Sequence, residues 1–584
     1  MAYRQKWREY CLLLCVGLIL IALALLPLSG SVIYIKPSAP INLLYVASGV
    51  FALVFWRDFA RVKAIAPLIG FFAIVLALGA LSSLYSANSY ESLQNVRRLA
   101  FDGLFMLISY LVLRRLDSRG FAIFFMLLLV VVFIQPVATI VDFGIDYANG
   151  DISVNTRATG FSNDQPLVYS FILLFAAALS IAMLWLTRGK ARLYSAGLFV
   201  IALLAILANN SRLVFVALFV ALLLPFLLFR FAYKRWILAF VGGLALAFVA
   251  VVYVASAQWN ERYNFHKMAN HLSYVLSFEP ALMGRFDKAC APEVIFYNNA
   301  FDFTAPLPFH AYNHNSLFFT KYSAIPALIK EFSALESSAD FTIKGAYLRT
   351  SRHYGWLLCS RFSFPKDESF SWEHSSLARL SMNKSVLQAI WQSPLRPNGF
   401  GFLGYVDNVE KIFPRDSLHH SYVLSLADRP KGYPHPHNQL LSLAFELSIL
   451  GLVAIGGFCY MVFFHKLRLV LRTLESRLDS SSSGALSFSQ ALARNSYGIV
   501  FVCGVVFIVA LSVAMIFDCL LWRWNTTYLF VLFGIVLAAK DALLRQESKL
   551  IRNVYGSFVA TTGDKVVGSS TIKEALNGDK RESS

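Results

Sequence analysis

Two histidines stand in the stretch 433–440, which reads Tyr-Pro-His-Pro-His-Asn-Gln-Leu and leads directly into an apolar run. Pro434 and Pro436 disfavour helix just before His437, whereas the residues that follow have the composition of a membrane span. His437 is therefore expected at a helix N-terminus at the membrane surface. An imidazole takes up and releases a proton near neutral pH, so His437 is a candidate general base and His435 is its rival. Solvated loop histidines without chemistry are the alternative interpretation.

Three arginines fall on the same predicted side of the membrane as His437. Arg157 lies in a loop, Arg212 opens an apolar run, and Arg379 lies on the segment 376–391, which has helical apolar spacing. Guanidinium groups pair with phosphate oxygens through two parallel hydrogen bonds and keep their charge. This set suits a lipid substrate with a phosphate or diphosphate headgroup. Taken singly, each arginine is also explained by snorkelling to the interface or by capping of backbone carbonyls.

The composition describes a polytopic membrane protein and excludes a soluble one. The chain has 584 residues, of which 57% are hydrophobic and 15% are charged. The formal net charge of +18 does not require nucleic acid, because cytoplasmic loops of membrane proteins accumulate Lys and Arg. Twelve apolar runs have spanning length or come close to it: about 11–29, 41–56, 65–83, 99–113, 121–141, 167–187, 193–209, 211–230, 236–257, 438–464, 497–518 and 524–540.

The basic residues alternate between the loops as these spans require. Lys and Arg gather at the N-terminus and in every second loop, which places both termini in the cytoplasm. The loops 30–40, 84–98, 142–166 and 258–437 then lie on the outer side. The fold class is all-α, with a mainly helical periplasmic loop domain. The predicted domains are a membrane domain with spans one to nine (1–257), the large periplasmic loop (258–437), spans ten to twelve (438–540) and a cytoplasmic tail expected to be disordered (541–584).

Three parts of the chain resemble the O-antigen ligase and polymerase family. They are Asn210-Ser211-Arg212 opening an apolar span; Arg379 with Trp391, Ser393-Pro394 and the glycines at 399, 401 and 404; and His437-Asn438 with Leu440, Glu446 and Gly451. Their order, spacing and sidedness, between about Arg157 and Gly456, carry the resemblance. It implies about twelve spans and one large periplasmic loop just before the histidine span.

The resemblance implies glycan transfer from undecaprenyl diphosphate at the periplasmic face of a bacterial inner membrane. His437 would be the general base, Arg212 and Arg379 would neutralise the diphosphate, and Arg157 would be a weaker third contact. Supporting groups are implied at His435, Asn438 and Glu446. The His-Asn signature favours a ligase acting on lipid A–core over a polymerase acting on another lipid-linked repeat. A protein O-oligosaccharyltransferase acting on Ser or Thr is less favoured.

The chain departs from the family's pattern at two places and carries one insert. The family often has glycine two residues after the glutamate, where this chain has Ser448. It often reads Pro-hydrophobic-Gly-x-Gly where this chain has Arg396-Pro397-Asn398 before Gly399. The insert at about 261–373 is longer than a plain ligase needs, so it leaves the acceptor open.

A transporter or lipid flippase is the alternative from another class, because twelve spans and basic residues suit one. Transporters place ionisable residues near mid-bilayer and show repeated halves. Here only Asp102 and Glu446 are candidates for such residues, and the long loop breaks any symmetry.

No metal or cofactor is expected. Four histidines, at 419, 420, 435 and 437, have no acidic or cysteine partner at compact ligand spacing. Of the seven cysteines, only Cys290 and Cys359 fall in the large loop, where a disulfide between them is possible.

Overall fold

The computed structural model describes most of the membrane part of the chain and short pieces of the large loop. The described residues are 2–28, 36, 38–86, 88–150, 157–161, 166–229, 295–297, 346–351, 355–359, 383, 386–387, 389–401, 436–479, 488–521 and 524–561.

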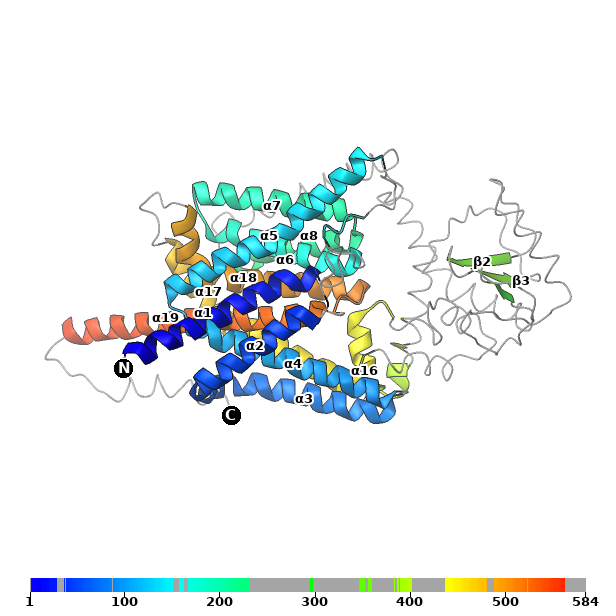
Figure 1. Cartoon of the computed structure of the whole chain (residues 1–584), viewed down its shortest axis with the longest axis horizontal. Coiled ribbons are helices and arrows are strands. Elements are labelled where there is room, and N and C mark those ends of the chain that lie inside the picture. The colour runs from blue at the N-terminus through cyan, green and yellow to red at the C-terminus, as the bar shows by residue number, and fades with distance from the viewer. Residues whose placement is uncertain are drawn as a thin grey trace.

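The described membrane part is helical, as the sequence predicts (Figure 1). The first half contains α1 (Ala2–Leu25), η1 (Leu26–Leu28), α2 (Ser38–Phe55), η2 (Trp56–Ile65), α3 (Ala66–Ser82), η3 (Ser83–Tyr85), α4 (Ser89–Arg114), α5 (Ser118–Ala148), α6 (Pro166–Leu186), α7 (Lys190–Asn209) and α8 (Arg212–Leu228). The second half contains α16 (Gln439–Cys459), the π-helical turn η6 (Tyr460–Phe464), α17 (Leu467–Asp479), α18 (Phe488–Phe517) and α19 (Trp524–Thr561).

Within the described residues, nine helices are long and apolar enough to cross a membrane. They match nine of the twelve predicted spans and confirm the all-α polytopic class. Two other predicted spans are also helices: α8 has a shorter apolar part, Leu213–Leu228, and α4 carries Glu91, Arg97 and Arg98 in its outer half and Asp102 at its middle. The span predicted at 236–257 lies outside the described residues.

The last two spans pack inside the first half of the chain. Buried residues make up 78% of the most apolar window of α18 and 89% of that of α19, against 28% in α3. Helix α19 lies along α4, and α18 lies along α6 and α8. At Gly534 of α19, a Cβ atom would collide with the carbonyl oxygen of Met106 in α4, so glycine allows this close approach. Asp102 of α4 is buried and accepts a hydrogen bond from Thr527 Oγ1 of α19 at 2.7 Å.

Successive helices alternate in direction, so one end of the bundle gathers residues 83–86, 88, 157–161, 209–211, 394–401, 437 and 518–521. We call it the outer end, because the sequence predicts that it faces the periplasm. Figure 1 shows α7 and α8 along the upper side of the bundle and α3 and α4 along the lower side.

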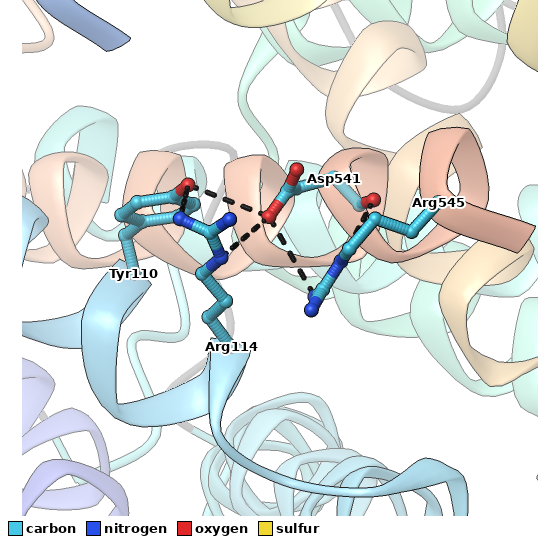
Figure 2. A network of polar contacts seen from close by, with 4 residues as sticks. All are labelled: Tyr110, Arg114, Asp541 and Arg545. Carbon is cyan, nitrogen blue, oxygen red and sulfur yellow. Dashed lines mark hydrogen bonds and ion pairs between the residues drawn. The ribbon is translucent and has the colours of Figure 1, made fainter. Parts of the chain in front are cut away.

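At the opposite end, an ion-pair network joins α4 to α19 (Figure 2). Arg114 Nε lies 2.9 Å from Asp541 Oδ2, and Arg114 Nη1 donates to Tyr110 Oη at 3.0 Å. Arg545 Nη2 approaches the same carboxylate oxygen at 3.6 Å. Charged groups near hydrocarbon are costly unless they are paired, so the network fixes this end of the two helices.

The structure adds two features to these predictions. The described pieces of the large loop, which was predicted to be mainly helical, include an antiparallel sheet in the order β1 (Ile295–Tyr297), β3 (Gly355–Cys359), β2 (Ala346–Ser351). Strands β2 and β3 are rich in Tyr, Trp, Leu and Thr and are separated by only three residues, which favours a hairpin. Helix α19 continues past 540 to Thr561, so the first part of the predicted tail is helical, as its Ala, Leu, Lys and Arg content favours. Cys290 lies outside the described residues, so the disulfide stays a prediction.

Candidate active site

His437 stands one residue before the N-cap of α16. Its φ of 53° is in the left-handed region, where histidine is commoner than most residues. Asn438 is the N-cap, and its Oδ1 accepts a hydrogen bond from the Leu441 N–H at 3.0 Å. The predicted position of His437 at a helix N-terminus is therefore confirmed, and Asn438 has a structural role.

The imidazole of His437 is held by a carboxylate from a distant part of the chain. His437 Nδ1 lies 2.9 Å from Asp518 Oδ1, and the two side chains are 13% and 5% exposed. An ionised carboxylate only accepts hydrogen bonds, so in this contact Nδ1 carries the proton that it donates and Nε2 is the acceptor nitrogen of the neutral ring. A base oriented by a third group in this way is a recurring arrangement in enzymes that deprotonate a hydroxyl.

Asp518 occupies an unfavourable place for a negative charge. It directly follows the last residue of α18, and its N–H donates to the Ala514 carbonyl at 3.3 Å. An acidic side chain at a helix C-terminus opposes the helix dipole by about 0.3–1 kcal/mol. Two hydrogen bonds offset this cost: one from His437 and one from the Cys519 N–H at 2.8 Å. Sequence reasoning missed Asp518, although it is an isolated carboxylate at the outer end of a predicted span.

The loop 518–521 is fastened on two sides. Gln439, at the start of α16, accepts a hydrogen bond from the Leu521 N–H at 3.2 Å. Asn525, in the first turn of α19, donates to the Leu520 carbonyl at 2.7 Å. Both side chains are buried. The carboxylate and the imidazole therefore meet between elements that are already fixed, which preorganises the pair.

Helix α16 is broken nine residues after Gln439. Ser448 has φ 69° and ψ 173°, far from helical values. In a continuous helix the Ile449 N–H would donate to the Phe445 carbonyl. Here it donates instead to the carbonyl of Pro394 at 3.1 Å. The residues from Gln439 to Leu447 thus form a separate short helix, which we call the outer half of α16.

The segment 394–401 replaces the hydrogen bonds lost at this break. Asn398 Nδ2 donates to the Phe445 carbonyl at 3.0 Å, and the Asn398 N–H donates to the Glu446 carbonyl at 3.3 Å. Broken helices in membranes are tolerated where neighbouring groups satisfy the freed backbone in this way. Asn398 belongs to the insertion by which the chain departs from the family's pattern, and the structure shows what it contacts.

Glu446 fastens the same segment. Its Oε2 accepts a hydrogen bond from the Gly401 N–H at 2.7 Å, and its Oε1 accepts one from Ser442 Oγ at 2.8 Å. Gly401 has φ 93°, and a Cβ atom there would collide with the Asn95 side chain. The carboxylate of Glu446 therefore anchors the segment 394–401 on α16.

A second cluster lies at the α7–α8 turn. The Ala158 N–H donates to the Ala208 carbonyl at 3.2 Å, and Asn209 Nδ2 donates to the Ala158 carbonyl at 3.0 Å. These bonds hold Arg157, which is partly exposed, beside the turn that leads into Arg212, the first residue of α8. Buried Ser211 Oγ has no hydrogen-bond partner in the part of the chain that is described.

The other predicted site residues are not placed. Arg379 and His435 lie outside the described residues, as does the side chain of Arg212. The structure therefore brings the backbone of Arg212 to Arg157 and the outer half of α16 to Asp518. Helix α18, which ends at Phe517 just before Asp518, packs on both α8 and α16 and so connects the two clusters.

The comparisons with known proteins agree with this arrangement. No curated protein matches the sequence. Residues 197–456 match the model of a family described as O-antigen ligase. This segment contains Arg212, Arg379 and His437, whereas Arg157 and Asp518 lie outside it. Residues 197–456 are therefore similar to the O-antigen ligase family.

Proposed function

We propose that the protein transfers a glycan from undecaprenyl diphosphate to a sugar hydroxyl of lipid A–core. The observation that carries the proposal is the His437–Asp518 pair at the outer end of a membrane bundle. The reaction would take place at the periplasmic face of the bacterial inner membrane, with both termini cytoplasmic. The domain boundaries predicted from the sequence, at 257, 437 and 540, are part of the same proposal.

The proposed chemistry is one direct displacement. The acceptor hydroxyl loses its proton to His437 Nε2 while its oxygen forms a bond to the anomeric carbon. The bond between that carbon and the diphosphate oxygen breaks, and undecaprenyl diphosphate leaves with the electron pair from the opposite face. A single displacement inverts the anomeric configuration. Asp518 holds the imidazole in the tautomer that accepts the proton and stabilises the imidazolium that forms.

The α7–α8 turn is the proposed diphosphate site. The first N–H groups of a helix and the positive end of its dipole favour a bound anion. Arg212 begins α8, Arg157 is held beside it, and the Ser211 hydroxyl has a free donor. Arg379 is proposed as the third guanidinium. Positive charge at this place would stabilise the negative charge that develops on the leaving diphosphate. The arginines would thus take the place of a metal ion, and the proposed reaction is metal-independent.

The proposal is tested with the purified full-length protein in lipid nanodiscs. The donor is undecaprenyl diphosphate carrying a glycan, the acceptor is lipid A–core, and product is measured as a mobility shift of the acceptor on a gel. Replacing His437 by alanine should lower transfer about 10²- to 10⁴-fold, the usual contribution of a positioned base. His465→Ala is the matched control, because His465 lies just beyond the far end of α16 and should leave transfer unchanged.

The alternatives give other results. A polymerase would extend one lipid-linked repeat with another and leave lipid A–core unmodified. A protein O-oligosaccharyltransferase would use a Ser- or Thr-containing protein acceptor, and a transporter would move the donor across the bilayer without breaking its glycosidic bond. Full transfer by the His437→Ala variant would remove the base assignment.

A further inference from the structure

Two consecutive arginines at the outer half of α4 have no role in the site described so far. Arg97 and Arg98 are both exposed. Arg98 Nη1 donates to Asn95 Oδ1 at 3.4 Å. Among the described residues, no carboxylate lies within ion-pair distance of either guanidinium.

At the opposite end of α4, the arginines form ion pairs with carboxylates. Arg114 is paired with Asp541, as Figure 2 shows, and Arg115 is paired with Asp58. Both carboxylates come from other elements, α19 and η2. The fold therefore pairs the arginines at one end of α4 with carboxylates of other elements. At the other end, Arg98 interacts electrostatically, beyond ion-pair distance, with buried Asp102 one turn along α4.

The position of Arg97 and Arg98 along the membrane span explains why they need an anion. A span needs about 20 residues to cross the hydrocarbon core. Counted back from Leu113, next to the paired arginines, this span begins near Gln94 and includes Arg97 and Arg98 about one turn inside it. Arginine at this depth is costly, and outer-side arginine opposes the positive-inside bias. A phosphate group at the level of the outer headgroups is the anion that these guanidinium groups can reach by snorkelling.

The surroundings of the pair are those of a lipid-facing surface. Tyr90 and Leu93, on the face of α4 that leads to Arg97, are 73% and 49% exposed. On the neighbouring helix α2, Tyr45 is 38% exposed, and its ring packs edge-on against Phe101 at 5.0 Å. Apolar and aromatic groups therefore flank the two charges where acyl chains would lie.

This surface is connected to the base through the segment 394–401. The Phe400 N–H donates to Ser92 Oγ at 3.0 Å, and Asn95 Nδ2 donates to the Phe400 carbonyl at 3.4 Å. The next residue, Gly401, is bound by Glu446 of the outer half of α16. In Figure 1, α4 lies on the lower side of the bundle and α7 and α8 lie on the upper side.

We propose that Arg97 and Arg98 bind phosphate groups of the acceptor lipid in the outer leaflet. The inference rests on the proposed function and adds an acceptor subsite to it. The donor diphosphate binds at the α7–α8 turn, the phosphorylated acceptor binds on α4, and the acceptor sugar extends over the segment 394–401 toward His437.

The test compares the Arg97→Gln/Arg98→Gln double variant with wild type in nanodiscs of neutral lipid. Transfer is measured against the concentration of lipid A–core with its phosphates and of the same acceptor after dephosphorylation. We expect the variant to raise KM for the phosphorylated acceptor at least 10-fold, with kcat and KM for the donor unchanged. Dephosphorylation should raise KM in the wild type by a similar factor and should add little in the variant. Arg57→Gln/Lys63→Gln, which removes two exposed cations at the other end of the bundle, is the control and should change none of these values.

Several results would overturn the inference. These are an increase in KM for the donor instead of the acceptor, an equal loss with both forms of the acceptor, or no change at all. Equal competition by phosphatidylglycerol would also overturn it, because the arginines would then bind any anionic headgroup. Binding of fluorescent phosphorylated acceptor is measured in parallel on the inactive His437→Ala protein. Binding that depends on the arginines, in a wild type that transfers nothing, would refute the proposed function and keep the acceptor site.

Discussion

Replacing Ser448 by glycine should stabilise the protein, although glycine inside a helix normally destabilises one. With φ 69° and ψ 173°, Ser448 occupies a region that is essentially restricted to glycine, at a cost of about 1–3 kcal/mol. Its buried hydroxyl also has no hydrogen-bond partner among the described residues, and an unsatisfied buried group costs about 1–3 kcal/mol more. Glycine removes both costs but adds about 1 kcal/mol of unfolded-state entropy. At the low ends of these ranges, the net expectation is a stabilisation of about 1 kcal/mol.

The assay is the midpoint of thermal unfolding of the detergent-solubilised protein, followed by intrinsic fluorescence, beside two controls. Ser448→Ala removes the hydroxyl but keeps the Cβ atom, so it should gain the hydroxyl contribution and keep the backbone strain. Ser109→Gly is the matched control, because Ser109 is also buried, with a hydroxyl that has no partner among the described residues, but lies within the regular helix α4. Its loss of the hydroxyl offsets the cost of about 1 kcal/mol for glycine inside a helix, so it should be near neutral.

The difference between Ser448→Gly and Ser109→Gly measures the free-energy cost of the backbone conformation at Ser448. If the midpoint of Ser448→Gly were no higher than that of Ser109→Gly, Ser448 would not be strained, and the break in α16 would need another explanation. Transfer activity should be unchanged in Ser448→Gly, because the replacement hydrogen bonds of the segment 394–401 do not involve the serine side chain.

Three other substitutions test single contacts. Asp518→Asn should lower kcat about 10²-fold or more with KM little changed, because the amide can donate to His437 Nδ1 and stabilise the wrong tautomer, while Asp518→Glu should restore part of the rate. Asn398→Ala should destabilise the protein by about 1–3 kcal/mol in thermal unfolding, since it removes the hydrogen bond that Asn398 Nδ2 donates to the Phe445 carbonyl at the break in α16. Asp541→Ala should cost about 1–3 kcal/mol by stranding Arg114, and a double variant that also replaces Arg114 by leucine should recover much of the loss, as a double-mutant cycle would show. A kcat equal to that of the wild type in Asp518→Asn would refute the role of the His437–Asp518 contact. Unfolding midpoints equal to that of the wild type in Asn398→Ala or Asp541→Ala would refute the stabilising role of the contact that each variant removes.

The spans were predictable from the sequence because membrane insertion leaves a strong local signal. A run of about 20 apolar residues must be helical in hydrocarbon, since no other partner satisfies its backbone. The same signal is weak where charges interrupt it, and α4 is the example: Arg97, Arg98 and Asp102 dilute its hydropathy, but packing against α19 supplies a partner for Asp102. The sheet at 295–359 could not be found this way, because hydropathy along spans carries no information on strand pairing in a polar loop.

One member of the proposed catalytic pair, His437, was predictable and the other, Asp518, was not. The difference is that the neighbours of His437 in the sequence mark it, whereas only a contact between distant parts of the chain marks Asp518. His437 is marked by its neighbours, namely two prolines before it and an apolar helix after it. Asp518 follows an apolar run as many surface carboxylates do, and its role depends on a contact across 81 positions of the chain. Asn398 was visible only as a departure from a family pattern. Its function follows from the break at Ser448, which no propensity predicts, because serine is a poor residue for that backbone conformation.

The placement of charge within the bundle favours glycan transfer over transport. A transporter needs ionisable groups near mid-bilayer whose partners change during the cycle. In the described helices the deep charges have structural partners instead. Glu446 holds Gly401, Asp102 holds Thr527, and Lys540 donates to the carbonyls that end η6, those of Met461 at 2.8 Å and Val462 at 3.0 Å. At the outer end, the partly exposed His437 lies beside buried Asp518, and Arg97 and Arg98 are exposed. Chemistry confined to one face suits two lipid substrates that are both anchored in the outer leaflet.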